Sequence, residues 1–138
     1  MKLNQLLQAA SDKLEAAGLA YGHGTTNAHD EAVWLTLWQL GLPLDSALDE
    51  LAERACSEAE VAAVQALIQQ RIATRQPAAY LTHEAWLQGV PFYVDERVIV
   101  PRSFLAEFIA AAEGAESIDD WLGEHTKQVL DLCTGNGS

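Results

Sequence analysis

The sequence predicts a mostly α-helical chain: a helical domain over residues 1–76, a β-hairpin linker over 77–102, and over 103–138 the first helix and strand of an α/β domain. Three observations lead to this assignment. Apolar residues recur at helical spacing through the first 76 residues. Two short apolar runs flank Gln88-Gly89, as in a hairpin. A final run, 128–132, leads into a Gly-x-Gly turn, which is typical of the first strand of a nucleotide-type βα unit.

The helical domain begins with two amphipathic helices. The first is predicted to end at Gly18, and its apolar face consists of Leu3, Leu6, Leu7, Ala10, Leu14 and Ala17. Asn27 can cap the second helix. The negative charges of Asp30 and Glu31 in its first turn interact favourably with the positive end of the helix dipole. Its apolar positions are Ala32, Val33, Leu35, Leu37, Trp38 and Leu40, with Trp34 also expected in the core, and Gly41 and Pro43 end it.

Two further helices complete this domain. A short third helix is predicted from Asp45 or Ser46 through Arg54. Ser57-Glu58-Ala59-Glu60 is a capping box, which favours the start of a fourth helix. That helix is predicted to end before Pro77, and its apolar face consists of Val61, Val64, Leu67, Ile68 and Ile72.

The apolar pattern changes after Pro77. The run from Trp86 to Val94 predicts two strands joined around Gln88-Gly89, followed by a turn at 95–97 and a third extended run at 98–100. A helix is predicted over 103–113, with a short turn at 118–122 before the final strand.

The chain is strongly acidic, with a net charge of −12 and a pI of about 4.5. This balance argues against nonspecific binding to nucleic acid or to an anionic membrane. A basic protein partner would suit the charge, although excess acid often serves only solubility. The acidic residues are unevenly distributed: the net charge of residues 1–70 is −7, whereas that of residues 71–102 is +1.

The remaining residue types exclude several kinds of site. Cys56 and Cys133 form no CxxC pair, the first residues lack the apolar segment of a signal peptide, and no apolar stretch reaches membrane-spanning length. These features predict a cytoplasmic protein with reduced thiols. The four histidines lack metal-ligand spacing, so no metal site is expected, and no nucleophilic triad can be assigned.

Two segments are candidates for chemistry. Glycines in the turn of residues 133–137 let the backbone approach a cofactor closely, and the spacing Gly135-x-Gly137 differs from the usual dinucleotide fingerprint. The guanidinium of Arg102 suits a carboxylate, although a surface charge is the simpler interpretation. The aromatic residues before it are most simply core residues.

The longer pattern resembles a known family. Pro77-x-x-Tyr80-Leu81, an aromatic hairpin, Val98-Ile99-x-Pro101-Arg102 and Val129-Leu130-Asp131-Leu132-x-Thr134-Gly135-x-Gly137 are together similar to the glutamine methyltransferases of the translation machinery. In that family a helical substrate-recognition domain is joined by a β-hairpin to a Rossmann-like domain that binds S-adenosylmethionine. The resemblance covers the whole chain and is densest over residues 71–138.

The resemblance implies a branch and a substrate. One branch acts on peptide-chain release factors and usually has Pro-Arg-Pro-Glu-Thr-Glu at the linker. This chain has Pro101-Arg102-Ser103-Phe104-Leu105 there and, with 84–97, looks like the branch that methylates the large-subunit ribosomal protein L-three. Because that substrate is basic, an acidic recognition domain is physically sensible.

The resemblance also implies which residues meet the cofactor. Cys133, Thr134, Gly135, Asn136 and Gly137 would line the methionine and ribose side of S-adenosylmethionine. Asp131 would orient that loop or the ammonium group of the cofactor. Pro101 and Arg102 would lie beside the pocket.

The chain departs from the family pattern at two points. Cys133 replaces the first glycine of the motif, and its Cβ narrows the approach to the cofactor and disfavours positive φ. The Asn-Pro-Pro-Tyr loop, which in this family positions the substrate amide for methyl transfer, is absent. The sequence therefore predicts an N-terminal fragment that has no catalytic residues and binds the cofactor weakly or not at all.

Two alternatives stay open. The first is the release-factor branch, which performs the same chemistry on another target. The second is a helical protein-interaction module without enzymatic activity. An acidic residue after a further strand, followed by Asn-Pro-Pro-Tyr, would distinguish an enzyme from such a module.

Overall fold

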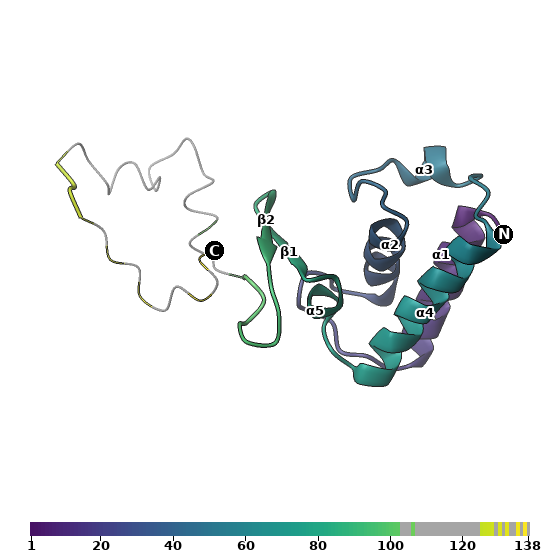
Figure 1. The fold of residues 1–138 in the computed structure, drawn as a ribbon, viewed down its shortest axis with the longest axis horizontal. Helices are drawn as coiled ribbons and strands as arrows, with labels where there is room; N and C mark the ends of the chain where they lie inside the picture. The colour runs from purple at the N-terminus through teal and green to yellow at the C-terminus, as the bar shows by residue number, and fades with distance from the viewer. Residues whose placement is uncertain are drawn as a thin grey trace. The chain divides into compact units, whose positions relative to one another are not determined.

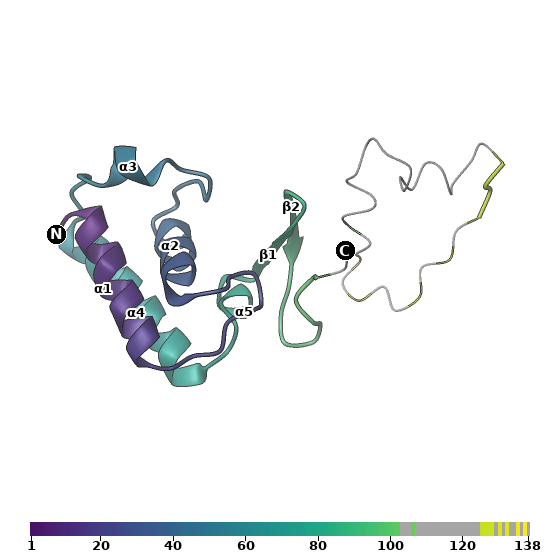
Figure 2. The ribbon, with the colours of Figure 1, turned by 180° about the vertical axis from the view of Figure 1, so that it is seen from behind.

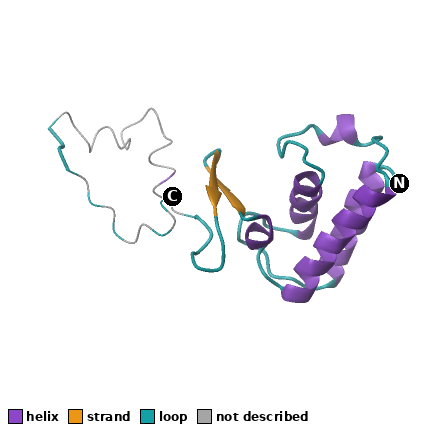
Figure 3. Ribbon diagram, viewed as in Figure 1, coloured by secondary structure: helices purple, strands orange, loops and turns teal. Residues whose placement is uncertain are grey.

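The chain forms two compact units in the computed structural model, Met1–Thr82 and His83–Ser138. The structure describes residues 1–102, 106, 125–128, 130, 132, 135 and 137. Helices dominate this part of the chain, and its only two strands are antiparallel neighbours (Figure 3). The predicted mostly α-helical class with a hairpin is therefore confirmed.

The helical unit is built from three long helices and two short ones. These are α1 (Leu3–Ala16), α2 (Ala28–Gln39), α3 (Leu48–Leu51), α4 (Glu58–Thr74) and α5 (Ala78–Thr82). The helices α1 and α4 lie side by side, and α2 packs against both (Figures 1 and 2). The short α3 lies between the end of α2 and the start of α4, and α5 packs against α2.

The predicted helix ends are observed in atomic detail. The side chain of Asn27 accepts a hydrogen bond of 2.9 Å from the backbone N–H of Asp30, which caps α2. Ser57 and Glu60 form the expected capping box at the start of α4. Arg75 ends α4 in the left-handed conformation with φ of 56°, and Gly18, just after α1, has the same φ of 56°.

The core of this unit lies where α1, α2 and α4 meet. It includes the predicted apolar residues of the three helices except Leu37, which is buried outside this cluster, and adds residues from the loops and from α5. Its best-buried side chains are Leu3, Leu6, Leu14, Ala32, Leu35, Val64 and Ile68. Trp34 and Trp38 are partly buried against this cluster, as expected for core residues. Cys56 is a buried free thiol.

Backbone hydrogen bonds tie the start of α1 to the segment that follows α3. The N–H of Leu3 donates to the carbonyl of Arg54 at 2.9 Å, and the N–H of Cys56 donates to the carbonyl of Met1 at 2.9 Å. Lys2 and Ala55 form an isolated antiparallel bridge in the middle of this contact. The N–H of Asn4 also donates to the carbonyl of Ala52. Two of the N–H groups at the start of α1 that have no partner within the helix, those of Leu3 and Asn4, are therefore hydrogen-bonded.

Two predictions about this unit need correction. The third helix is confined to Leu48–Leu51, because Ser46 does not cap it: its hydroxyl donates to the carbonyl of Pro43 at 2.6 Å and closes a turn. Sequence analysis also missed α5, which begins directly after Pro77. Its five residues are too few to show a helical period, although Ala78 and Ala79 are fully buried.

The second unit contains the predicted hairpin. Strands β1 (Glu84–Leu87) and β2 (Val90–Tyr93) are antiparallel, with Leu87 paired to Val90 across a two-residue loop. Gln88 and Gly89 have φ of 49° and 77°. Positive φ at both central residues is the mark of a type I′ turn, whose twist matches that of the strands. The hairpin predicted around Gln88-Gly89 is confirmed.

The described segments after the hairpin agree with the prediction only in part. The turn at 95–97 is present, with the side chain of Asp95 accepting a hydrogen bond of 3.0 Å from the backbone N–H of Arg97. The run at 98–100 is not a strand, since neither β1 nor β2 pairs with it. Ala106 is helical, and the rest of the predicted helix 103–113 and the turn 118–122 lie outside the described residues.

The predicted final strand, 128–132, is likewise not seen in the residues that can be described. Gln128, Leu130 and Leu132 are outside any strand, and the two leucines are 80% and 75% exposed. An extended segment counts as a strand only through pairing with a neighbour, and no described residue pairs with these three.

Candidate functional site

The glycine turn predicted to hold a cofactor is described at both of its glycines. Gly135 has φ of 62° and Gly137 has φ of 87°. These values lie in the region that side chains with a Cβ rarely adopt, so glycine is needed for the conformation itself. At Gly137 an added Cβ would meet nothing within 4 Å. Glycine is therefore required there by the backbone conformation and not by a lack of space.

The other candidate cofactor residues are placed only in part. Asp131, Cys133, Thr134 and Asn136 lie outside the described residues. Pro101 is partly buried, and the neighbouring Arg102 is exposed. In the described part of the chain Arg102 makes no hydrogen bond or ion pair.

The described residues contain no group of three or more histidine, cysteine or acidic side chains that could hold a metal ion. No helix among them is both long and apolar enough to cross a bilayer.

The helical unit holds a buried ion pair that sequence analysis missed. The Nε of Arg71 on α4 donates to Oε1 of Glu31 on α2 at 2.8 Å, and the two side chains are only 2% and 4% exposed. Arg71 also donates through Nη2 to the carbonyl of Ala20 at 3.2 Å. Thr25 donates to the second carboxylate oxygen of Glu31 at 3.1 Å. Through these hydrogen bonds the pair holds the loop between α1 and α2 against α2 and α4.

A signal for this pair was present in the sequence. Glu31 falls three residues after Ala28 and four before Leu35, on the buried side of α2. Arg71 likewise follows Leu67 by four residues and Ile68 by three on α4. Opposite charges on two apolar faces indicate partners, because an unpaired buried charge is very costly.

Next to this pair lies Tyr21, whose buried hydroxyl has no hydrogen-bond partner among the described residues. Burial raises the pKa of Tyr21, and the negative charge of Glu31 raises it further. The tyrosine is therefore a neutral phenol at physiological pH. Its surroundings fit a structural role, since all of these groups are turned away from solvent.

The surface around α3 is acidic. Asp45, Asp49, Glu50 and Glu58 are exposed there. Two neighbouring carboxylates are paired with cations: Glu53 with Lys2, and Glu60 with Arg54 at 2.6 Å. Over residues 1–82 ten acidic residues face five basic ones, a net charge of −5.

The hairpin exposes aromatic side chains on one of its faces. The register places Glu84 opposite Tyr93 and Trp86 opposite Pro91, so all four lie on the same side of the ribbon. Trp86 is 48% exposed and Tyr93 is 64% exposed. The ring of His83 stacks on Tyr93, with the centroids 5.5 Å apart. We call Glu84, Trp86, Pro91 and Tyr93 the aromatic face.

Beside this face, Asp95 and Arg97 form a bidentate pair. Arg97 Nη2 lies 2.6 Å from Oδ2 of Asp95, and hydrogen bonds from Arg97 hold the pKa of the Asp95 carboxyl well below its usual range. The opposite side of the hairpin contains Ala85, which is buried, and Phe92, which is partly buried. This side is therefore less exposed than the aromatic face, except at Val90 beside the turn, which is 51% exposed.

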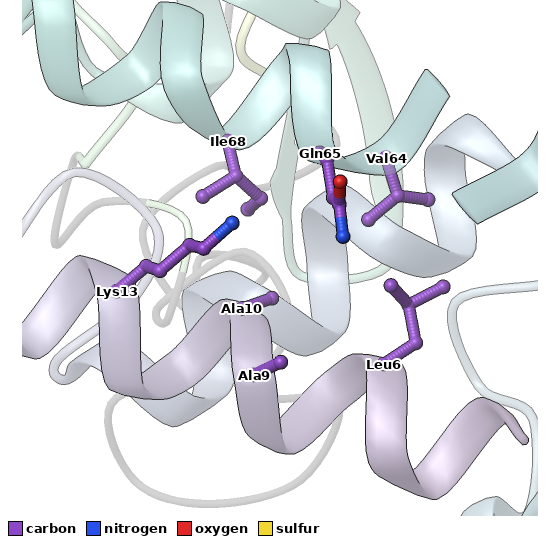
Figure 4. Close-up of a pocket in the computed structure, with 7 residues that line it drawn as sticks. All are labelled: Leu6, Ala9, Ala10, Lys13, Val64, Gln65 and Ile68. Carbon is purple, nitrogen blue, oxygen red and sulfur yellow. The ribbon is translucent and has the colours of Figure 1, made fainter. Parts of the chain in front are cut away.

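A shallow groove runs between α1 and α4 (Figure 4). Its walls are Leu6, Ala9, Ala10 and Lys13 of α1 and Val64, Gln65 and Ile68 of α4. Val64 and Ile68 point toward α1, where the small Ala9 and Ala10 leave the space open. The groove is mostly apolar and lacks the converging polar groups of a small-molecule site.

Comparison with known proteins gives one consistent result. The chain is 46% identical over 137 residues to the ribosomal protein uL3 glutamine methyltransferase of Neisseria gonorrhoeae, covering 98% of this chain and 44% of that protein. It is 45% identical to the protein of that name from Burkholderia pseudomallei, covering 98% and 43%. For the Bordetella pertussis protein the identity is 44%, covering 98% and 44%. No family model matches the chain. The chain thus spans less than half the length of these curated relatives.

Proposed function

We propose that this chain, which over 98% of its residues is similar to proteins named ribosomal protein uL3 glutamine methyltransferase, forms the N-terminal part of such an enzyme. The enzyme would transfer a methyl group from S-adenosylmethionine to the side-chain amide of a glutamine in that ribosomal protein. The similarity over 137 residues supports this proposal, because it takes in the helices, the hairpin and the glycine turn together. The rest of the enzyme would supply the catalytic loop.

Each part of the chain has a role in this proposal. Residues 1–76 form the substrate-recognition domain, 77–102 the hairpin linker and 103–138 the start of a Rossmann-like cofactor domain. The compact helical unit supports the first assignment, since it has its own core. The two-residue turn of the hairpin supports the second, because it makes a short connection of defined shape.

The cofactor in this proposal is S-adenosylmethionine, which supplies an electrophilic methyl group on a sulfonium centre. The glycine turn fits such a ligand, because Gly135 and Gly137 have the positive φ that brings backbone close to a bound group. Thr134 and Asn136 would line the same turn, beside Cys133, and Asp131 would orient it. Pro101 and Arg102 would flank the pocket.

The substrate in this proposal is a basic ribosomal protein, which is synthesised in the cytoplasm, and we place the enzyme in that compartment. The acidic surface around α3 supports this substrate: Asp45, Asp49, Glu50 and Glu58 are exposed there. Complementary charge speeds association and favours the correct partner. Methyl transfer to an amide nitrogen depends mainly on positioning, so a separate recognition domain is useful for such a reaction.

The first test compares two substrates. The enzyme that contains this chain is incubated with methyl-labelled S-adenosylmethionine and with either uL3 or a peptide-chain release factor. We expect label on uL3 alone. Label on the release factor alone would move the chain to the other branch, and label on neither would support a non-enzymatic interaction module.

The second test addresses recognition. Binding of uL3 should weaken as salt is raised from about 50 to 300 mM, because screening shortens the reach of surface charge. Affinity that does not change with salt would remove the acidic surface from the proposal. A quadruple variant, with Asp45, Asp49, Glu50 and Glu58 changed to the corresponding amides, should reproduce the high-salt affinity at low salt.

A further inference from the structure

The aromatic face of the hairpin is preorganised. The indole N–H of Trp86 donates to Oε1 of Glu84 at 2.5 Å, which fixes the ring beside a carboxylate. Tyr93 is held by the His83 ring, which lies nearly parallel to it at an interplanar angle of 12°. The type I′ turn fixes the strand register and with it the spacing of the two aromatic rings. The rings are therefore held in place although they are about half exposed.

The chemistry around these rings selects for a cation. The face of an indole or phenol ring carries negative electrostatic potential, which attracts ammonium and guanidinium groups. Residues 83–97 contain three carboxylates, those of Glu84, Asp95 and Glu96, against the single cation Arg97. Arg97 is engaged by Asp95. Aromatic rings with a carboxylate at their edge match a lysine or arginine side chain and offer little to an anion.

We propose that the aromatic face of the hairpin binds a lysine or arginine side chain from a basic segment of the protein substrate. This inference rests on the proposed function, since it takes uL3 as the substrate. It assigns to the linker a share of recognition that is distinct from the acidic surface around α3. The contact is local and specific, whereas the acidic surface acts over a distance.

Steady-state kinetics of the complete enzyme tests the proposal. We expect Trp86→Ala to raise the KM for uL3 about fivefold, the loss of one exposed cation–π contact, with kcat and the KM for S-adenosylmethionine unchanged. Trp86→Phe should restore most of the affinity because it keeps a ring. Glu84→Gln keeps the oxygen that accepts from Trp86 and removes the charge, so it should raise the same KM by a smaller factor.

Val90→Ala is the matched control. Val90 is also on the hairpin and is 51% exposed, but it lies on the opposite side of the ribbon. It should leave the KM for uL3 unchanged. If Trp86→Ala instead lowers kcat or the affinity for S-adenosylmethionine, or changes nothing, the aromatic face is covered by another part of the enzyme and the inference is wrong.

A second measurement separates this inference from the proposed function. An arginine-rich peptide and its glutamate-substituted counterpart are titrated against this chain, with Trp86→Ala and Val90→Ala as variants. We expect only the arginine peptide to bind, and only Trp86→Ala to weaken it. Peptide binding that depends on Trp86, without methylation of uL3, would refute the function and keep the cation site. If uL3 is methylated but Trp86→Ala does not weaken peptide binding, the proposed function is kept and the cation site is refuted.

Discussion

The helical unit and the hairpin treat their polar and aromatic residues in opposite ways. The helical unit buries an ion pair, Glu31 with Arg71, among the leucines of its core. The hairpin instead holds Trp86 and Tyr93 at the surface, beside the carboxylates of Glu84 and Asp95. The buried ion pair joins α2 to α4, and the loss of one partner would cost much stability. The aromatic rings of the hairpin are instead at the surface, where a partner can contact them.

This difference predicts where substitutions affect stability and where they affect binding. In the helical unit the buried ion pair is part of the packing, so loss of one partner should lower the stability of the fold. In the hairpin the aromatic residues contribute little to folding, so their loss should be seen in substrate binding.

The largest effect is expected from breaking the buried ion pair. Arg71→Ala leaves the carboxylate of Glu31 buried without its cation, which should lower the free energy of unfolding by about 3–5 kcal/mol. Urea denaturation followed by circular dichroism measures it. A change below about 1 kcal/mol would mean that solvent reaches the carboxylate.

The matched control removes both charges together. Arg71→Met with Glu31→Leu replaces the pair by apolar side chains of similar size, and it should recover most of the stability, since such replacements are often neutral. If the double variant is as unstable as Arg71→Ala, the contacts with Ala20 and Thr25 contribute more than the pair itself.

A smaller effect is expected from a cavity in the helical core. Leu35 is fully buried, and Leu35→Ala should cost about 2–4 kcal/mol of unfolding free energy. The equivalent truncation in the hairpin, Val90→Ala, should cost less than about 0.5 kcal/mol, because Val90 is half exposed. Equal losses at the two sites would contradict the contrast between the units.

Loss of a helix cap is expected to cost less again. Ser57→Ala removes the oxygen that accepts from the backbone N–H of Glu60, and it should lower stability by about 1 kcal/mol. Ser57→Thr keeps an acceptor and serves as the control. Thermal unfolding of the two variants side by side should separate them by several degrees, with the threonine variant close to the parent chain.

The smallest effect is an acid dependence at the same helix end. The backbone N–H of Ser57, Arg54 and the Ser57 hydroxyl lower the pKa of Glu60 from 4.5 to about 2. A lowered carboxyl pKa adds stability that is complete above pH 4.5 and is lost as the pH falls toward 2. Glu60→Gln should therefore flatten the stability profile within that window. The effect is slight because Glu60 is near the surface.

The elements governed by local chemistry were predictable from the sequence. The helices α1, α2 and α4 were predicted from their apolar period and their caps, and the hairpin from Gln88-Gly89. The third helix was predicted too long because the choice of Ser46 between capping a helix and closing a turn with Pro43 depends on the surrounding structure.

The features that depend on distant partners were not predictable in this way. Glu31 was interpreted as a favourable charge at a helix start, but its role is set by Arg71, forty residues away. The exposure of Trp86 and Tyr93 was also missed, because aromatic residues in a hairpin are most simply read as core. At Gly135 and Gly137 the positive φ values explain the glycines through backbone conformation, and the cofactor role predicted for this turn stays a prediction.

The backbone bridge at Lys2 has a consequence for the order in which the chain folds during synthesis. The first turn of α1 donates to the carbonyls of Ala52 and Arg54, which the ribosome adds about fifty residues later. Until that segment emerges, the N–H groups at the start of α1 lack these partners. The helical unit must therefore complete itself as a whole, and no folded precursor made of α1 and α2 alone is expected on the nascent chain.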